Sequence, residues 1–201
     1  MKNFTVKQNK LLEKDIQGFY NTEYIGYQQE GNPDFINHLK NMTKQKDELD
    51  LVKDFIEVAE RFEDDVQEII KKENLNHPTI VVVPRSKTEK SYKPCQLMFR
   101  KAISSIADKL GFDNQTSAIK RIKNTKTTHN WRMENNTGDM PYPGITKDTC
   151  EICKSNIANK DIILVDDIYT EGVNTIEDCL QTLLELGAKS VILYVIAKTR
   201  R

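Results

Sequence analysis

The stretch Asp161-Ile-Ile-Leu-Val-Asp-Asp-Ile-Tyr-Thr-Glu-Gly-Val-Asn174 decides which fold this sequence predicts. Its apolar run, 162–165, is typical of a buried strand, and two adjacent carboxylates, Asp166 and Asp167, follow that run. A short glycine-containing loop then leads into residues 176–184, where apolar side chains recur at the spacing of an amphipathic helix. We therefore expect a strand, a loop and a helix in this order.

This segment combines carboxylates with free backbone N–H groups at the carboxyl end of a strand. In open α/β sheets, ligands bind at that end. The N–H groups at a helix start suit a phosphate, whereas Asp166 and Asp167 repel a phosphate and suit the cis-hydroxyls of a ribose. The segment therefore predicts a site for a sugar phosphate. The alternative is an ordinary strand–loop–helix with an acidic residue near the helix start.

A second unit of the same kind precedes this one in the sequence. Residues 79–83 form a β-branched apolar run, residues 84–90 form a polar loop, and a helical apolar pattern follows. Gly111 and Gly187 are expected to end the two helices, and residues 191–196 read as the next strand. Alternation of strands and helices indicates an α/β fold with a mostly parallel sheet.

The remaining segments are less regular. Residues 1–20 carry scattered apolar side chains and are interpreted as a helix packed on the domain or as a partner-facing arm, and residues 24–27 as a short strand. Residues 47–72 show a helical apolar stripe opposite a charged face, which predicts a long surface helix. Residues 124–160 are rich in Asn, Thr, Gly and Pro, and we expect them to form a mobile lid without regular structure.

The composition limits the class of protein. With 201 residues, one domain is expected, with an N-terminal arm and hood elements at 1–45 and a core at 46–201. The 30 basic and 30 acidic residues give a net charge of +0, which argues against a nucleic-acid-binding face but leaves a local basic patch open. No apolar run approaches about 20 residues, and the N-terminus lacks a signal core, so we expect a cytoplasmic protein without a membrane span.

The 4 cysteines do not indicate a disulfide scaffold in a chain of this length. Cys150 and Cys153 form a CxxC pair, whereas Cys95 and Cys179 fall on expected helices, and the histidines show no metal-ligand spacing. The favoured interpretation is a pair of ordinary loop cysteines. A four-cysteine zinc site shared between two subunits and a redox pair are the alternatives.

Residues 162–174 resemble the phosphoribosyl diphosphate (PRPP) binding motif of type I phosphoribosyltransferases. That motif has four apolar residues, two acids, two apolar residues and Thr-Thr-Gly-x-Thr; here its last part is Thr170-Glu171-Gly172-Val173-Asn174. Weaker matches resemble the ComF-like branch of this family over residues 24–198, without the N-terminal zinc ribbon of many relatives. They are Tyr27, Phe35-Ile36, Leu39-Lys40, Val83-Pro84, Arg121, Lys123, Thr125, Arg132 and Asn135.

The resemblance implies a Rossmann-like three-layer phosphoribosyltransferase fold. Its mostly parallel sheet of about five strands would lie under a small hood, built from residues before 45 and from 124–160. Asp166 and Asp167 would hold the ribose hydroxyls, directly or through water on a Mg²⁺ ion. The 5′-phosphate would be held by Thr170, Asn174 and the backbone N–H groups of Glu171, Gly172 and Val173. The diphosphate would be held by Arg85, Ser86 and Lys87, because an arginine fork suits phosphate oxygens.

Two positions depart from the family motif, and two residues fall in the expected lid. Glu171 stands where the family has a small hydroxyl residue, and it would oppose a phosphate by about 3 kcal/mol at ~6 Å. Either its side chain turns to solvent or phosphate affinity falls. Asn174 also replaces a hydroxyl residue but can still donate a hydrogen bond. In the lid, Trp131 either stacks on a base or packs into the hood, beside Arg132.

The function that the resemblance implies is transfer of phosphoribose from PRPP to a nitrogenous base or amine, with release of diphosphate. One alternative is a non-catalytic module that senses PRPP or a nucleotide. Another is an accessory protein of DNA uptake or processing, implied only by the ComF-like resemblance. The acceptor and the oligomeric state are open, with a homodimer as one arrangement.

Overall fold

The chain folds around a six-stranded mixed sheet. The computed structural model describes residues 1–40, 47–128 and 136–200. The strands of the main sheet are β1 (Lys2–Val6), β2 (Ile16–Tyr24), β3 (Thr79–Val82), β4 (Asp113–Asn114), β7 (Asp161–Tyr169) and β8 (Ser190–Thr199). They lie in the order β1-β2-β8-β7-β3-β4. Within these described residues, a separate two-stranded antiparallel sheet consists of β5 (Ile119–Arg121) and β6 (Cys150–Ile152).

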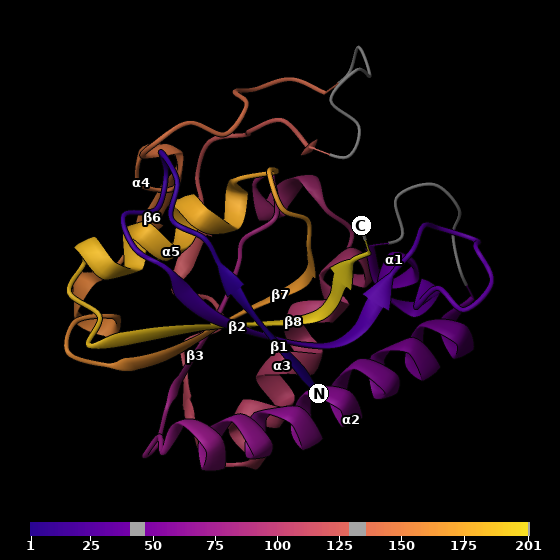
Figure 1. Ribbon diagram of the computed structural model, residues 1–201. Helices are drawn as coiled ribbons and strands as arrows, with labels where there is room; N and C mark the ends of the chain where they lie inside the picture. Colours follow the sequence, from indigo (N-terminus) through magenta and orange to yellow (C-terminus); the bar gives the residue numbers. More distant parts are fainter. Residues whose placement is uncertain (41–46, 129–135, 201) are drawn as a thin grey trace.

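The helices cover both faces of the main sheet. They are α1 (Asp34–Lys40), α2 (Glu48–Glu73), α3 (Met98–Lys109), α4 (Ile145–Thr149) and α5 (Thr175–Glu185), with short 3-10 turns η1 (Glu89–Ser91), η2 (Pro94–Leu97) and η4 (Lys154–Asn156). Figure 1 shows α2 and α3 below the sheet and α5 above it. In the part of the chain that the structure describes, no helix is long and apolar enough to cross a membrane.

The direction of the strands confirms a mainly parallel α/β sheet. The pairs β2–β8, β8–β7, β7–β3 and β3–β4 are parallel, and only the edge pair β1–β2 is antiparallel. From β3 the chain crosses through α3 to β4 on one side, whereas β7, α5 and β8 follow on the other side. Crossovers that leave in opposite directions make a topological switch point, which lies here between β3 and β7.

Two apolar cores lie on the two faces of this sheet. Ile163 and Val165 of β7 join the core under α1, α2 and α3, whereas Ile162 and Leu164 join the core under α5. Successive side chains of a strand point to opposite faces, so a strand with helices on both sides needs a continuous apolar run. This is why the run 162–165 is apolar at every position.

The helix ends follow the sequence signals. Asp47 caps α2 by accepting a hydrogen bond from the backbone N–H of Asp50. Gly111 and Gly187, with φ angles of 69° and 91°, follow the last turns of α3 and α5. The predicted ends of these two helices are therefore confirmed. A left-handed residue after the last turn allows the chain to satisfy the final carbonyl groups and turn back.

The N-terminal segment differs from the prediction. Residues 1–20 form neither a helix nor an arm, because β1 and most of β2 lie in this range and extend the main sheet beyond β8. The strand expected at 24–27 is also wrong, since β2 ends at Tyr24. Gly18 allows the close pairing of β1 and β2, because a Cβ there would lie 2.6 Å from the ring of Phe4. Among the described residues of 1–45, those that border the ligand cavity described below begin with Tyr24, the last residue of β2.

The segment 124–160 also differs from the prediction. Its described parts, 124–128 and 136–160, contain α4, β6 and η4 instead of a structureless lid. We call β5, β6 and α4 together the hood; Figure 1 shows α4 and β6 above α5. The hood forms because β6 pairs with β5, with Cys150 opposite Arg121. The expected lid residues Trp131, Arg132 and Asn135 lie outside the described residues.

Candidate functional site

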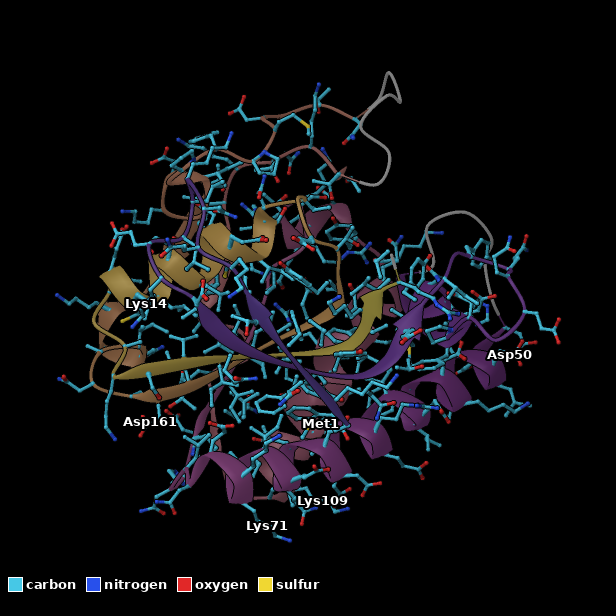
Figure 2. All side chains as sticks on the ribbon, viewed as in Figure 1. Met1, Lys14, Asp50, Lys71, Lys109 and Asp161 are labelled. Carbon is cyan, nitrogen blue, oxygen red and sulfur yellow. The ribbon has the colours of Figure 1, made fainter. Side chains whose placement is uncertain are left out.

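A cavity of about 420 Å³ lies at the carboxyl ends of β3 and β7. It is therefore at the switch point, where open α/β sheets bind their ligands. Figure 2 labels Asp161, which marks the opposite, amino end of β7. Residues from β7, the β3–α3 connection, the start of α5, α1 and the hood line the cavity. Its volume is within the range of about 300–1,000 Å³ that is typical of small-molecule sites.

The carboxylates of Asp166 and Asp167 lie at this cavity because β7 is longer than its neighbour β3. Pairing with β3 ends at Val165, opposite Val82, whereas pairing with β8 continues to Tyr169. β7 therefore projects beyond β3, and both aspartates line the cavity there. The backbone N–H of Asp167 donates a 2.9 Å hydrogen bond to Oδ1 of Asp166. The sequence predicted where this pair lies, but the predicted strand ended at residue 165, whereas β7 continues to Tyr169.

The loop after β7 is a tight turn. The N–H of Val173 donates a 3.2 Å hydrogen bond to the carbonyl of Thr170, and Gly172 has a φ of 87°. Positive φ at the third position alone is the geometry of a type II turn, which favours glycine. Thr170 and Val173 line the cavity, whereas Glu171, Gly172 and Asn174 do not. Because the N–H of Val173 is used inside the turn, it differs from the free donor that the sequence predicted.

The outer side of this turn faces solvent and the β1–β2 hairpin. Glu171 is exposed and does not line the cavity. Asn174 has a φ of 69° and accepts a 3.5 Å hydrogen bond from Asn9 of the hairpin. Of the two alternatives for Glu171, the structure therefore favours a side chain turned to solvent. The Thr170 hydroxyl lies 2.5 Å from the Thr199 hydroxyl, which holds the turn beside β8.

The connection after β3 brings three predicted anion-binding residues into the same cavity. Arg85, Ser86 and Lys87 all line it. The guanidinium of Arg85 stacks 4.1 Å from the centre of the Tyr92 ring and donates to the carbonyl of Gln96 at 2.5 Å. These contacts fix the Arg85 side chain on the α3 side of the cavity.

Ser86 and Lys87 contact residues on both sides of the segment 129–135, which lies outside the described residues. The Ser86 hydroxyl lies 2.8 Å from the hydroxyl of Thr127. Nζ of Lys87 donates to the carbonyl oxygens of Thr125 at 2.7 Å and Thr137 at 2.5 Å. Burial lowers the pKa of Lys87. An ammonium group in this position connects the β3 loop to both sides of that segment.

Three further cations line the cavity that the sequence did not predict as site residues. They are Arg100, Arg121 and Lys126. Arg121 is buried and donates through Nε to the carbonyl of Arg85 at 3.1 Å. Arg100 pairs with Glu89 at 2.5 Å. Arg121 entered the sequence argument only through the family resemblance, and Arg100 carries no local signal because its burial depends on packing between α3 and η1.

One buried acid in the cavity wall was missed entirely. Glu177, in the first turn of α5, is 1% exposed and lines the cavity. Its Oε1 accepts a 3.0 Å hydrogen bond from the Tyr169 hydroxyl, and its Oε2 is buried without a partner among the described residues. Burial raises the pKa of Glu177, and the charge of Glu171 adds to the rise. The spacing Asn174-x-x-Glu177 indicates only a helix start.

The cavity wall also includes residues from the end of β2, from the loop that follows it and from α1. They are Tyr24, Tyr27 and His38, respectively. Nδ1 of His38 lies 3.0 Å from Oδ2 of Asp54, so the neighbouring helix α2 orients the imidazole ring. This wall therefore presents two phenol rings and one oriented imidazole.

The donor set limits which metal ion the site suits. No group of three or more His, Cys, Asp or Glu side chains that could hold a metal occurs among the described residues. Cys150 is buried and Cys153 is exposed, although they form the CxxC pair. Mg²⁺ is commonly bound by one or two carboxylates, waters and substrate phosphates. Asp166 and Asp167 fit that kind of site in the company of a phosphorylated ligand.

Comparison with known proteins provides no relative. No protein-family model matches this chain, and no curated protein matches it. The function therefore has to be inferred from the cavity and the residues that line it.

Proposed function

We propose that this protein is a phosphoribosyltransferase that binds PRPP with Mg²⁺ and transfers phosphoribose to a nitrogenous base or amine. One observation carries the proposal. One cavity at the switch point is lined by the two adjacent carboxylates of Asp166 and Asp167 and by part of the tight turn before α5, whose geometry suits a phosphate. The same cavity is lined by cations from the β3–α3 connection and from the hood. A ribose with phosphates at both ends requires this combination, because hydroxyls suit carboxylates and phosphates suit cations and helix starts.

The parts of PRPP correspond to parts of the cavity. Asp166 and Asp167 hold the ribose hydroxyls at the end of β7. The turn with Thr170, together with the first N–H groups of α5, holds the 5′-phosphate. The diphosphate lies toward Arg85, Ser86 and Lys87, where the buried guanidinium of Arg121 adds positive charge. This is the phosphoribosyltransferase arrangement of an α/β sheet, and it is the finer fold assignment that we propose.

The residues act mainly by position and charge. When bound, Mg²⁺ neutralises the diphosphate and makes it a better leaving group; Asp166 and Asp167 would hold this ion directly or through water. A nitrogen lone pair forms the new bond to ribose C1 as the bond to diphosphate breaks, diphosphate leaves with the electron pair, and the nitrogen then releases its proton to solvent. Arg85 and Lys87 stabilise the negative charge that develops on the diphosphate. Electrostatic stabilisation of this kind is usually the largest single contribution to catalysis.

A second candidate is a non-catalytic module that senses PRPP or a nucleotide. The contacts of Lys87 favour it, since its ammonium group donates to the carbonyl oxygens of both Thr125 and Thr137. An anionic ligand competes for this ammonium group and so changes how the loop after β3 is joined to Thr125 and Thr137. Binding without turnover would then be the function.

Diphosphate release separates these functions. The purified protein is incubated with PRPP, Mg²⁺ and a panel of purines, pyrimidines and simple amines, and diphosphate is measured enzymatically. Release that depends on one acceptor supports the transferase. PRPP binding without release for any acceptor supports the sensor. Absence of both, with salt-dependent retention of single-stranded DNA, would contradict both and favour a DNA-processing role.

A further inference from the structure

Tyr92 contacts each of the residues to which we assign the diphosphate. Its ring stacks on the guanidinium of Arg85, at 4.1 Å from the ring centre. Its hydroxyl oxygen accepts a 3.0 Å hydrogen bond from the backbone N–H of Lys87 and lies 3.5 Å from the Ser86 hydroxyl. Tyr92 is half-buried and lines the cavity itself. One side chain therefore joins the two ends of the segment 85–87.

The segment 85–87 needs such contacts because it belongs to no helix or strand. β3 ends at Val82, and the next element along the chain is η1, which begins at Glu89. Side-chain contacts therefore have to fix the directions of its guanidinium, hydroxyl and ammonium groups. A loop that becomes ordered only when its ligand arrives binds more weakly, because the cost of ordering reduces the free energy of binding.

Tyr92 is itself held from the side of α3. It follows η1 directly, and its backbone N–H donates a 3.0 Å hydrogen bond to the carbonyl of Glu89. The carboxylate of Glu89 in turn pairs with the guanidinium of Arg100, on α3, at 2.5 Å. The Tyr92 ring is thus anchored to a helix, and the segment 85–87 is anchored to the ring.

The ring and the hydroxyl of Tyr92 have separate effects on the segment. Stacking on an aromatic face fixes the plane of the Arg85 guanidinium, so that its N–H fork keeps one direction. The hydroxyl satisfies the backbone N–H of Lys87, which fixes the position from which the lysine side chain extends. Phenylalanine at position 92 would keep the first effect and lose the second, whereas leucine would lose both.

We infer that Tyr92 is the positioning residue of the diphosphate subsite, and that it holds Arg85 and Lys87 in their binding orientation before the ligand arrives. The inference rests on the proposed function and deepens it, because it names the side chain that organises the leaving-group end of the site. Tyr92 acts through its neighbours and not on the reacting atoms. Since the 5′-phosphate is assigned to the turn at 170–173 and to α5, loss of Tyr92 should affect one end of PRPP only.

The test separates the two ends of PRPP. Inorganic diphosphate with Mg²⁺, PRPP with Mg²⁺ and ribose 5-phosphate are titrated calorimetrically into wild-type protein, Tyr92→Phe and Tyr92→Leu. We expect the Kd values of diphosphate and PRPP to weaken by about fivefold in Tyr92→Phe and by about twentyfold in Tyr92→Leu, because one contact and then two are lost. The Kd of ribose 5-phosphate should change by less than about twofold. A general loss of structure would weaken the binding of all three ligands.

The matched control is Tyr142→Phe. Tyr142 donates a 3.0 Å hydrogen bond from its phenol hydroxyl to Asp148 and does not line the cavity, so this substitution makes the same chemical change without affecting any of the three ligands. A thermal melt checks that each variant folds. Tyr92→Phe removes a single oxygen atom, and it carries the test if Tyr92→Leu does not fold.

The outcomes distinguish the inference from the proposed function. If PRPP binds the wild type and Tyr92→Phe equally, or if ribose 5-phosphate binding falls in parallel, the inference is overturned and the proposed transferase stands. If diphosphate binding depends on Tyr92 in a protein that does not bind PRPP, the positioning role is retained and the transferase is rejected. If neither diphosphate nor PRPP binds the wild type, both are overturned.

Discussion

The carboxylate of Asp178 accepts a 2.6 Å hydrogen bond from the backbone N–H of Gly144 and so joins the hood to helix α5. Its second oxygen accepts from the N–H of Thr146 at 2.7 Å, and Asp178 is 1% exposed. One buried side chain thus holds the start of α4 against α5, the helix that follows the turn at 170–173. The hood wall of the cavity depends on this contact.

Asp178→Ala should therefore destabilise the protein. The substitution leaves two backbone N–H groups, of half-buried Gly144 and buried Thr146, without their acceptors, which costs about 2–4 kcal/mol. Urea denaturation of both proteins measures the difference. The control is Asp148→Ala in the same segment, where the carboxylate is exposed and accepts a hydrogen bond from the Tyr142 hydroxyl. It should cost less than about 1 kcal/mol; equal losses for both variants would contradict the role of Asp178.

The stability of the wild type should fall with rising pH relative to Glu177→Gln. The pKa of Glu177 is raised above its ordinary value of 4.5, mainly by burial, so the folded protein binds the proton more tightly than the unfolded chain. Below 4.5 both states are protonated and Glu177 costs nothing. Above the raised pKa, folding has to bury the charge, and stability is lost as pH rises through this window. Urea denaturation from pH ~4 to ~8 should show the variant gaining relative stability with pH; a constant difference would contradict the account.

Lys87→Gln should weaken PRPP binding. Removal of this cation from the cavity deletes a charge-assisted contact with the diphosphate, worth about tenfold in Kd. The dependence of binding on salt should fall at the same time, because one ionic contact is lost. Lys90→Gln is the control, since Lys90 is exposed in η1 and does not line the cavity. Calorimetric titration that shows the same weakening in both variants would mean a general charge effect only.

Glu171→Thr should leave PRPP affinity nearly unchanged. Although this substitution restores the small hydroxyl residue of the family motif, the Glu171 side chain is exposed and does not line the cavity. We expect a change in Kd of less than about threefold, because a charge in solvent is strongly screened. Titration of PRPP into both proteins measures it. Tightening of tenfold or more would show that the Glu171 carboxylate reaches the phosphate after all.

The local parts of the fold could be predicted from the sequence. The strand around 162–165, the helix after it and the glycines Gly111 and Gly187 follow from apolar spacing and backbone preference within a few residues. The aspartate pair at the carboxyl end of that strand follows from the same pattern. These features depend on neighbours in the sequence, which a single chain reveals.

The parts that depend on distant contacts could not be predicted. β2 is a strand because it pairs with β8, whose residues follow at positions 190–199, and its own side chains give only a weak apolar alternation. β5 and β6 have three residues each and exist through their mutual pairing. The burial of Glu177 depends likewise on Tyr169 and on the hood packed beside α5. A helix-start glutamate in the sequence does not reveal this burial.

The measurement that tests the central claim most directly is calorimetric titration of PRPP with Mg²⁺ into the wild type and into the double variant Asp166→Asn, Asp167→Asn. Asparagine keeps the shape of both side chains, so a thermal melt should show that the fold is intact. We predict clear binding to the wild type and a loss of at least about a hundredfold in the variant, because two charged hydrogen-bond acceptors at the end of β7 are removed. No binding to the wild type, or equal binding to both proteins, would contradict the assignment of this cavity as a PRPP site.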